Sequence, residues 1–223
     1  MIPISVIIPC LNERDRIIST VNIVKAWQPS CQIIVVDDGS TQDSKYYFNQ
    51  LKNVLLITHP KNLGKSQAIC SGLKKATGSI IIFLDADLIN LKPSNLDKLY
   101  LPILKNKADM VVADYRSVLP KVFRLFYGGQ RAFKRTDIIS QLKTISTFTG
   151  RIPGYMLEPS LNRYFFNRRT AFVNFRNVHH FDENKKSGCI KGPVKYCQNF
   201  FTTLNYLGLT EFLRQILFIS RNY

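Results

Sequence analysis

The fold is decided by two stretches in which an apolar run ends in carboxylates: IIVVDDGS at residues 33–40 and IIIFLDAD at residues 80–87. Each apolar run is typical of a buried β-strand. Carboxylates that follow a buried strand are costly unless a cation or a ligand uses them. Because the carboxyl ends of parallel strands meet at one edge of a sheet, we expect the two acidic clusters to share one site.

Strand-like and helix-like segments alternate around these stretches through residue 114. Strands are expected at residues 5–9, 33–36, 54–58, 79–84 and 110–113. Helices are expected at about 13–27, 41–51 and 65–76 and after Ser94, with Ser40 or Thr41 and Ser94 as caps and Gly78 ending the third helix. Near-continuous apolar strands separated by helices predict an α/β, Rossmann-like fold with a mostly parallel central sheet flanked by helices.

The chain becomes less regular after Asp114, so we distinguish a first half, residues 1–114, from a second half, residues 115–223, within one domain. In the second half we expect a helix from Thr136, a helical stretch that carries Glu158, a strand at 171–180, a charged loop at 182–192 and a helical tail at about 195–219. An apolar stripe runs along this tail through Leu204, Leu207, Phe212, Leu213, Ile216 and Leu217. It is expected to pack on the core of the protein, with contact to a membrane surface as the alternative.

The charge is strongly positive and unevenly distributed. The net charge is +16, and residues 1–114 hold 13 Lys and Arg against 10 Asp and Glu, whereas residues 115–223 hold 18 against 5. A basic second half favours an anionic partner such as a nucleic acid, an anionic membrane surface or a phosphorylated substrate. We do not expect nucleic acid, because the acidic strand ends would repel its phosphates.

The sequence also bears on the cellular compartment. No apolar run approaches the ~20 residues of a membrane-spanning helix, and no basic region precedes a hydrophobic one at the N-terminus. The five cysteines are scattered and never form a CxxC pair, which favours reduced thiols over a disulfide framework or a zinc site. A cytoplasmic protein is expected, with peripheral contact to the inner face of the membrane left open.

The acidic clusters suit two kinds of ligand. Asp85 and Asp87 offer hard oxygen ligands to Mg²⁺ or Mn²⁺, which completes its coordination shell with water and substrate phosphates. Asp37 and Asp38 can accept hydrogen bonds from the N–H groups of a base or from ribose hydroxyls. Together they predict a site for a nucleotide and a divalent cation.

The tripeptide Gly64-Lys65-Ser66 is not part of a phosphate-binding P-loop. That motif needs a glycine five residues before Gly64, where this chain has His59. Lys65 still begins an expected helix, and a helix N-terminus with a lysine attracts phosphate.

Four motifs, in this order, resemble those of family 2 glycosyltransferases with the GT-A fold: SVIIPxxNE at 5–13, VVDDGS at 35–40, NLGK at 62–65 and FLDAD at 83–87. Within that family the chain is similar to the dolichyl-phosphate mannose synthase and glucosyl-phosphoglycerate synthase branches. Beyond residue 114 the resemblance thins to Gly129-x-Arg131-Ala132, to Gly154-x-x-x-Glu158 and to the histidine pair before Lys186-x-Gly188. It implies a nucleotide-sugar-binding half at 1–114 and an acceptor-binding half at 115–223 that ends in an amphipathic helix.

The resemblance also implies roles for particular residues. The base and ribose would be held by Pro9, Glu13, Asp37 and Asp38, and the same nucleotide-sugar pocket would include Asn12, Lys65 and Ala86. Asp85 and Asp87 would hold the Mg²⁺ or Mn²⁺ that bridges the diphosphate and offsets charge on the leaving group. Arg131 would face the diphosphate or an anionic acceptor, where a planar fork of donors suits phosphate.

Two further candidates follow from the second half. The resemblance to GT-A enzymes suggests a histidine as a further metal ligand, and His179 and His180 are the candidates. Successive strand residues point to opposite faces, so at most one of them can serve, and His180 is preferred. Glu158 is the candidate general base for a hydroxyl acceptor. Many relatives have Glu-Asp here, whereas this chain has Glu158-Pro159. A phosphate acceptor is already an anion and needs no base, so the missing acid favours a phosphorylated or lipid-linked acceptor.

The sequence therefore predicts a glycosyltransferase that moves a hexose from a UDP- or GDP-sugar to an anionic or polyprenyl-phosphate acceptor, with Asp87, Arg131 and Glu158 as catalytic candidates. In-line displacement with inversion is favoured, although the similar glucosyl-phosphoglycerate branch retains configuration. The alternatives are transfer to a soluble hydroxyl with Glu158 as base, a sugar nucleotidyltransferase and, outside the enzymes, a nucleic-acid-binding protein. A nucleotidyltransferase usually has a glycine-rich loop after its first strand, and residues 9–13 contain no glycine.

Overall fold

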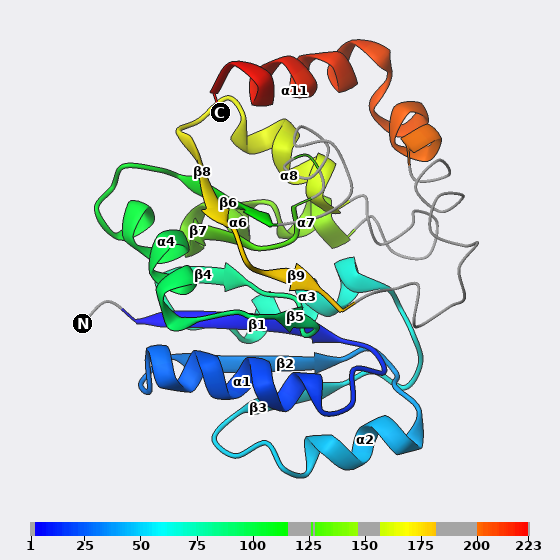
Figure 1. Ribbon diagram of the computed structural model, residues 1–223. Coiled ribbons are helices and arrows are strands. Elements are labelled where there is room, and N and C mark those ends of the chain that lie inside the picture. Colours follow the sequence, from blue (N-terminus) through cyan, green and yellow to red (C-terminus); the bar gives the residue numbers. More distant parts are fainter. Residues whose placement is uncertain (1–2, 116–125, 127, 147–156, 182–199, 223) are drawn as a thin grey trace.

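The computed structural model describes residues 3–115, 126, 128–146, 157–181 and 200–222. Its centre is one sheet with the strand order β3-β2-β1-β4-β7-β6-β8 (Figure 1). The strands are β1 (Ile4–Cys10), β2 (Gln32–Asp37), β3 (Leu55–Thr58), β4 (Ile80–Phe83), β6 (Met110–Tyr115), β7 (Arg131–Lys134) and β8 (Thr170–Phe175). Neighbouring strands are parallel except in the two pairs made by β7. The predicted α/β fold with a mostly parallel central sheet is confirmed.

The central strands are apolar on both faces because helices cover both. In β1, Val6 and Ile8 belong to one core cluster, and Ile7 between them belongs to the other. The first cluster is covered by α1 (Arg16–Trp27) and α4 (Pro93–Leu104). The second is covered by α3 (Lys65–Lys75), α6 (Arg135–Ser140), α7 (Leu142–Ser146), α8 (Leu157–Phe165) and α11 (Leu209–Asn222). Strand β3 lies at the sheet edge, where Leu55 and Leu56 are exposed.

Strand β7 is an element that the sequence pattern did not reveal. It lies between β4 and β6 and runs antiparallel to both, with Phe83 opposite Arg131. Its four residues are too few to show a period, and they begin and end with basic residues. The antiparallel pairing carries Gly129 and Gln130, which precede β7, to the carboxyl end of β4.

The strand expected at residues 171–180 is two strands. β8 ends at Phe175, and a turn closed by the Val178 N–H on the Phe175 carbonyl separates it from β9 (His179–His180). β9 pairs antiparallel with β5 (Leu88–Ile89), so that His180 lies opposite Leu88. This small second sheet carries the histidine pair to the acidic strand end at Asp87.

Helix boundaries differ from expectation in a few places. α2 (Gln42–Phe48) is shorter than expected. α4 begins at Pro93, which favours the first helical position, and the Asn95 side chain accepts the Lys92 N–H at 2.9 Å. Ser94 therefore lies inside the first turn and is not the cap. The helical tail is interrupted at Gly208, whose φ is +76°, between a helix at 200–207 and α11.

The tail stripe packs on the core on one side only. Phe212 is buried, and Leu204, Leu207 and Ile216 pack partly against the second core cluster. Leu213 remains 47% exposed. Within the described ranges, no helix is both long enough and apolar enough to cross a membrane. The expected loop at 182–192 and the start of the tail lie outside the described residues.

Gly78 has a different role from the one expected. α3 ends at Lys75, and Gly78 lies beyond it, where a Cβ would collide with the main chain of Ile4 and Ser5. The Gly78 N–H donates to Ser5 Oγ at 2.8 Å. Only a residue without a side chain allows the chain to pass this close to the start of β1.

We predict that Gly78→Ala destabilises the protein, because main-chain atoms cannot move away from the added methyl group. The free energy of unfolding, measured in urea, should fall by roughly 1–3 kcal/mol. Ser79→Ala is the matched control at the exposed neighbouring residue and should change it by less than about 0.5 kcal/mol. Equal stability of the two variants would contradict this role of Gly78.

Candidate active site

The acidic clusters meet where the strand order reverses. The chain runs outward from β1 to β2 and β3 and then returns to the other side of β1 to form β4. In open α/β sheets, ligands bind beyond the carboxyl ends of the strands at this point. Asp37 is the last residue of β2, and Asp85 follows β4 by two residues. The fold therefore brings both clusters to one edge, as the sequence predicts.

Asp85 is the centre of a network from four parts of the chain. Lys65, the first residue of α3, places Nζ 2.8 Å from Asp85 Oδ1 and 3.1 Å from Glu158 Oε1. Gln130 Nε2 donates to Asp85 Oδ2 at 2.6 Å. At Gly129 a Cβ would lie 2.7 Å from Lys65 Nζ and 2.8 Å from Asp85 Oδ2, so a side chain there would intrude into the site. The predicted residues Lys65, Asp85 and Glu158 are thus brought together, and Gln130 joins them without a sequence signal of its own.

Lys65 remains a cation within this network. Burial by itself lowers the pKa of its ammonium, but the charges of Asp85 and Glu158, with their hydrogen bonds, raise that pKa above its ordinary value. One positive charge therefore lies between two carboxylates at the edge of the sheet.

Of the two histidines, His180 faces the aspartates. Its Nδ1 lies 2.8 Å from Asp87 Oδ1, and its Nε2 lies 3.7 Å from Asp85 Oδ2. The His179 ring instead has Nδ1 3.4 Å from the Asn177 carbonyl. Burial lowers the pKa of His180, whereas its hydrogen bond to Asp87 and the charge of Asp85 raise it, and the net change is upward.

The donor set around Asp85 fits a divalent cation in chemical type. Carboxylate oxygens are the ligands that suit Mg²⁺ and Mn²⁺. Two buried oxygens, Glu158 Oε2 and Gln130 Oε1, lack a hydrogen-bond partner among the described residues. Within those residues no group of three His, Cys, Asp or Glu forms a metal-binding cluster. Asp85 and Asp87 would hold a cation that takes its remaining ligands from water and substrate.

The two aspartates of the first cluster have different surroundings. Asp37 Oδ1 accepts the Ser40 N–H at 2.8 Å, and its buried Oδ2 has no partner among the described residues. Asp38 accepts the N–H groups of Leu63 and Gly64 and contacts His59 Nδ1 at 2.7 Å. Asp37 therefore keeps one carboxylate oxygen, Oδ2, that can accept a hydrogen bond from a ligand, whereas both oxygens of Asp38 are contacted by donors of the protein.

The remaining donor-side candidates line the end of β1 and the turn after β4. Asn12, with φ +58°, accepts the Thr41 N–H on Oδ1 at 2.8 Å. Glu13 pairs with Arg16 at 2.9 Å, and Pro9 is partly buried near the end of β1. Ala86 is buried, and its carbonyl accepts the Thr20 hydroxyl at 3.1 Å. These contacts hold the loop backbone in place.

Arg131 does not occupy the position expected of it. Its side chain is fully buried, with Nε donating to the Gly128 carbonyl at 2.6 Å and Nη1 to Asn162 Oδ1 at 2.7 Å. In β7 it shares a face with Phe133, which α8 covers, so its guanidinium is directed into the core. Burial lowers its pKa to about 10, and the charge of Glu158 opposes this effect. Here Arg131 supports the loop before β7.

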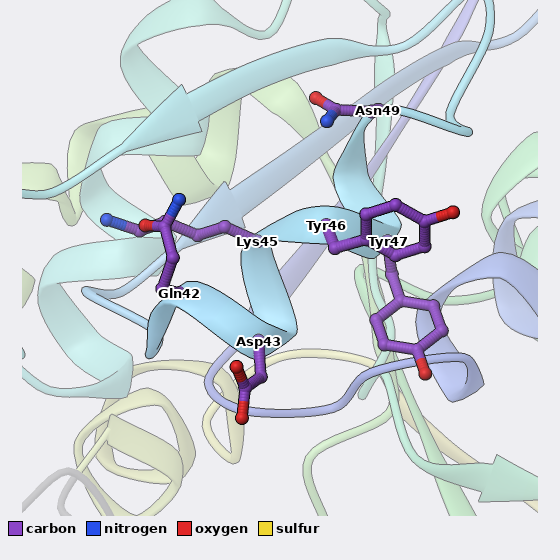
Figure 2. A pocket seen from close by; sticks show the side chains of 6 residues that line it. All are labelled: Gln42, Asp43, Lys45, Tyr46, Tyr47 and Asn49. Carbon is purple, nitrogen blue, oxygen red and sulfur yellow. The ribbon is translucent and has the colours of Figure 1, made fainter.

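A hollow of about 570 Å³ lies elsewhere, on α2 (Figure 2). Figure 2 shows its lining side chains, Gln42, Asp43, Lys45, Tyr46, Tyr47 and Asn49, all from α2 and the residue after it. None of the candidate site residues belongs to it, and Tyr46 is 66% exposed. The hollow is separate from the acidic clusters.

Comparison with known proteins points to one family. The family model described as "Glycosyl transferase family 2" matches residues 5–170. The undecaprenyl-phosphate 4-deoxy-4-formamido-L-arabinose transferase of Proteus mirabilis is 33% identical over 96 residues, which cover 39% of this chain and 29% of that protein. The glucosyl-3-phosphoglycerate synthase of Mycolicibacterium smegmatis is 31% identical over 109 residues, covering 45% of this chain and 36% of that one. These matches span only about a third of each relative.

Solved structures share the fold over most of the chain. Glucosyl-3-phosphoglycerate synthase from Mycobacterium tuberculosis, in complex with Mn²⁺, UDP-glucose and phosphoglyceric acid, has a TM-score of 0.73 at 24% identity. The match covers 93% of this chain and 80% of that chain. The same enzyme with Mg²⁺ and UDP has a TM-score of 0.66 at 23% identity and is matched over 81% of this chain and 72% of its own. At this level of identity the likeness establishes the GT-A fold alone.

We predict that Arg131→Met destabilises the protein, because it leaves the Gly128 carbonyl and the Asn162 amide without their buried donor. The free energy of unfolding in urea should fall by roughly 2–5 kcal/mol. Arg176→Met, at an exposed residue, is the control and should change it by less than about 0.5 kcal/mol. An Arg131→Met protein of unchanged stability with weakened nucleotide binding would instead support contact with a diphosphate.

Proposed function

This chain belongs to glycosyltransferase family 2, and on that premise we propose that it transfers a hexose from a nucleoside-diphosphate sugar to a phosphorylated acceptor with the help of Mg²⁺ or Mn²⁺. The observation that carries this proposal is the placement of Lys65 and Glu158 around Asp85 at the switch point of the sheet. Both charges needed for a diphosphate leaving group are then in one place: carboxylates for a cation and an ammonium for phosphate oxygens.

Residues of the first half would contact successive parts of the nucleotide sugar, from the base to the diphosphate. Asp37 would accept from the base or ribose through the buried Oδ2 that has no partner among the described residues. Lys65 would contact the phosphates, and Asp85 would help to hold the cation. That cation would neutralise the charge that develops on the leaving nucleoside diphosphate. His180 would hold Asp87 in orientation and is the candidate third ligand.

A phosphorylated acceptor is supported by charge. The second half of the chain carries 18 Lys and Arg against 5 Asp and Glu. The names of the relatives include an undecaprenyl-phosphate transferase, a dolichyl-phosphate β-glucosyltransferase from Trichomonas vaginalis and glucosyl-3-phosphoglycerate synthases. Their common chemistry is an acceptor with a phosphate group. We propose that the acceptor is a polyprenyl phosphate and that the protein acts in the cytoplasm at the membrane surface.

The surface of α11 supports contact with a membrane. Leu209, Leu213 and Leu217 recur at four-residue intervals and are 62%, 47% and 52% exposed. Such a row occupies one side of a helix, and a basic protein with an exposed apolar helix face suits an anionic lipid surface. In Figure 1, α11 and α2 lie at opposite ends of the view.

One observation favours a second candidate acceptor. Glu158 is buried, its Oε1 contacts Lys65, and its Oε2 has no hydrogen-bond partner among the described residues. A sugar or glycerate hydroxyl donating to Oε2 would give Glu158 the role of general base. Transfer to a soluble hydroxyl is therefore the alternative.

We predict that the protein releases nucleoside diphosphate from a UDP- or GDP-sugar only when Mg²⁺ or Mn²⁺ and an acceptor are present. A screen of both donors against polyprenyl phosphate and soluble acceptors, with product identified by mass, measures this. Removal of the metal by EDTA should abolish turnover, and added Mn²⁺ should restore it. Formation of pyrophosphate from a nucleoside triphosphate and a sugar 1-phosphate, tested in parallel, would instead indicate a nucleotidyltransferase.

Asp85→Asn should lower kcat/KM by about 100-fold or more, because the amide removes one of the negative charges that hold the cation. Asp43→Asn, at an exposed position of α2, is the matched control and should retain wild-type activity. An Asp85→Asn protein with full activity in metal-depleted buffer would exclude the metal role of this carboxylate.

The double variant Leu213→Glu, Leu217→Glu should lose binding to vesicles that contain anionic lipid, because two charges replace the apolar face of α11. Co-sedimentation with vesicles measures the bound fraction. Leu101→Glu, at an exposed leucine of α4 on the other side of the sheet, should leave binding unchanged. If the double variant binds vesicles as well as the wild-type protein does, α11 does not contact the membrane. If the double variant loses vesicle binding but keeps activity on a soluble acceptor, its defect is confined to lipid contact.

A further inference from the structure

His59 lies between two polar side chains near the first acidic cluster. Its Nδ1 is 2.7 Å from Asp38 Oδ1, and its Nε2 is 2.9 Å from Ser71 Oγ. A carboxylate only accepts hydrogen bonds, so Nδ1 carries the hydrogen of the first contact. His59 is buried, as is Asp38. The three side chains form a connected chain from the end of β2 to the second turn of α3.

Strand pairing brings these residues together. β2 and β3 are parallel, with Asp37 opposite Thr58, so the residues that follow, Asp38 and His59, leave the sheet side by side. The His59 N–H also donates to the Asp37 carbonyl at 2.8 Å. Neither the DDGS motif nor the NLGK motif includes His59, and none of the donor-side roles assigned above uses it.

Asp38 holds the start of α3. Its Oδ1 accepts the Leu63 N–H at 3.0 Å, and its Oδ2 accepts the Gly64 N–H at 2.8 Å. Gly64 is the N-cap of α3, and the next residue is Lys65, whose ammonium contacts Asp85 and Glu158. The orientation of the Asp38 carboxylate therefore fixes the main chain from which Lys65 projects.

We propose that His59 is a positioning residue for phosphate binding by Lys65, acting through Asp38. Ser71 fixes the ring at Nε2, the ring fixes the carboxylate of Asp38, and the carboxylate fixes the start of α3. This inference rests on the proposed function, because it assigns Lys65 to the phosphates of a nucleotide.

The order carboxylate, imidazole, hydroxyl also occurs in serine hydrolases, but the surroundings do not suit that chemistry. A hydrolase needs free N–H donors beside the nucleophile to bind an oxyanion. Ser71 lies inside α3, where the helix uses the main-chain N–H groups around it. Asp38 already accepts two main-chain N–H groups, so its place in the loop explains it without a hydrolytic role.

A double-mutant cycle between His59 and Lys65 tests the proposal. His59→Phe keeps a ring but removes both polar contacts, and Lys65→Met removes the ammonium. We expect His59→Phe to raise the dissociation constant for UDP or GDP, measured by calorimetry with Mn²⁺, by about 10-fold in the wild-type background. In the Lys65→Met background the same change should have an effect of less than about 2-fold, because the group being positioned is absent. His59→Asn, which offers an N–H close to the position of Nδ1, should restore most of the affinity.

Controls separate positioning from stability. Trp27→Phe removes the hydrogen bond from Trp27 Nε1 to Asp97 Oδ1, 2.8 Å long and between α1 and α4, and should leave nucleotide affinity unchanged. Ser71→Ala should weaken binding in the same direction as His59→Phe, and it decides the question if the His59→Phe protein does not fold. Equal effects in both Lys65 backgrounds, or a loss of thermal stability without loss of affinity, would overturn the proposal.

Nucleotide binding by the wild-type protein separates a failure of the proposed function from a failure of the role of His59. Wild-type protein that binds neither UDP nor GDP with Mn²⁺ overturns both the proposed function and the role of His59. Wild-type protein that binds, with a His59→Phe variant that binds equally well, overturns the role of His59 alone.

Discussion

The electrostatic balance around Asp85 is the constraint on which the site depends. Two carboxylates, Asp85 and Glu158, come from segments far apart in sequence, and the ammonium of Lys65 lies between them. Placing such carboxylates together away from water is costly unless a positive charge compensates them. Lys65, the first residue of α3, supplies that charge. The position at which α3 begins therefore determines whether Asp85 of the first half and Glu158 of the second half can lie close together. The same arrangement suits a divalent cation, which would be held by Asp85 and would leave the ammonium of Lys65 available to an anion.

Much of the donor side could be predicted from the sequence because its signals are local. An apolar run that ends in carboxylates locates both a strand and the residue after it, so Asp37 and Asp85 were expected at the sheet edge where they lie. The turn residue Gly64 and the following lysine likewise locate the start of α3. Family membership and the GT-A fold, which the motifs suggested, are confirmed.

What the sequence could not show depends on contacts between distant segments. The burial of Arg131 follows from the antiparallel insertion of β7, and four residues carry no period that would reveal it. Gln130 occupies the variable position of Gly129-x-Arg131-Ala132, and His59 lies outside the motifs. Only the pairing of β7 with β4 and of β3 with β2 gives them partners. The sequence could not distinguish the roles of Asp37 and Asp38 either, because only their hydrogen bonds show which carboxylate keeps an oxygen for a ligand. His180 was preferred over His179 from the sequence, but only the contact between its Nδ1 and Asp87 Oδ1 shows that it faces the aspartates.

The insertion of β7 has a consequence for how the chain folds. β4 and β6 precede β7 in the sequence, so they are synthesised before it. In the sheet they are joined only through β7. Until residues 131–134 arrive, both strands present an open edge, and such edges are prone to pair with other chains. Closing the sheet requires contacts between residues far apart in sequence, which slows folding and lengthens that exposure. The edges of β4 and β6 are therefore open to pairing with other chains until β7 is added between them.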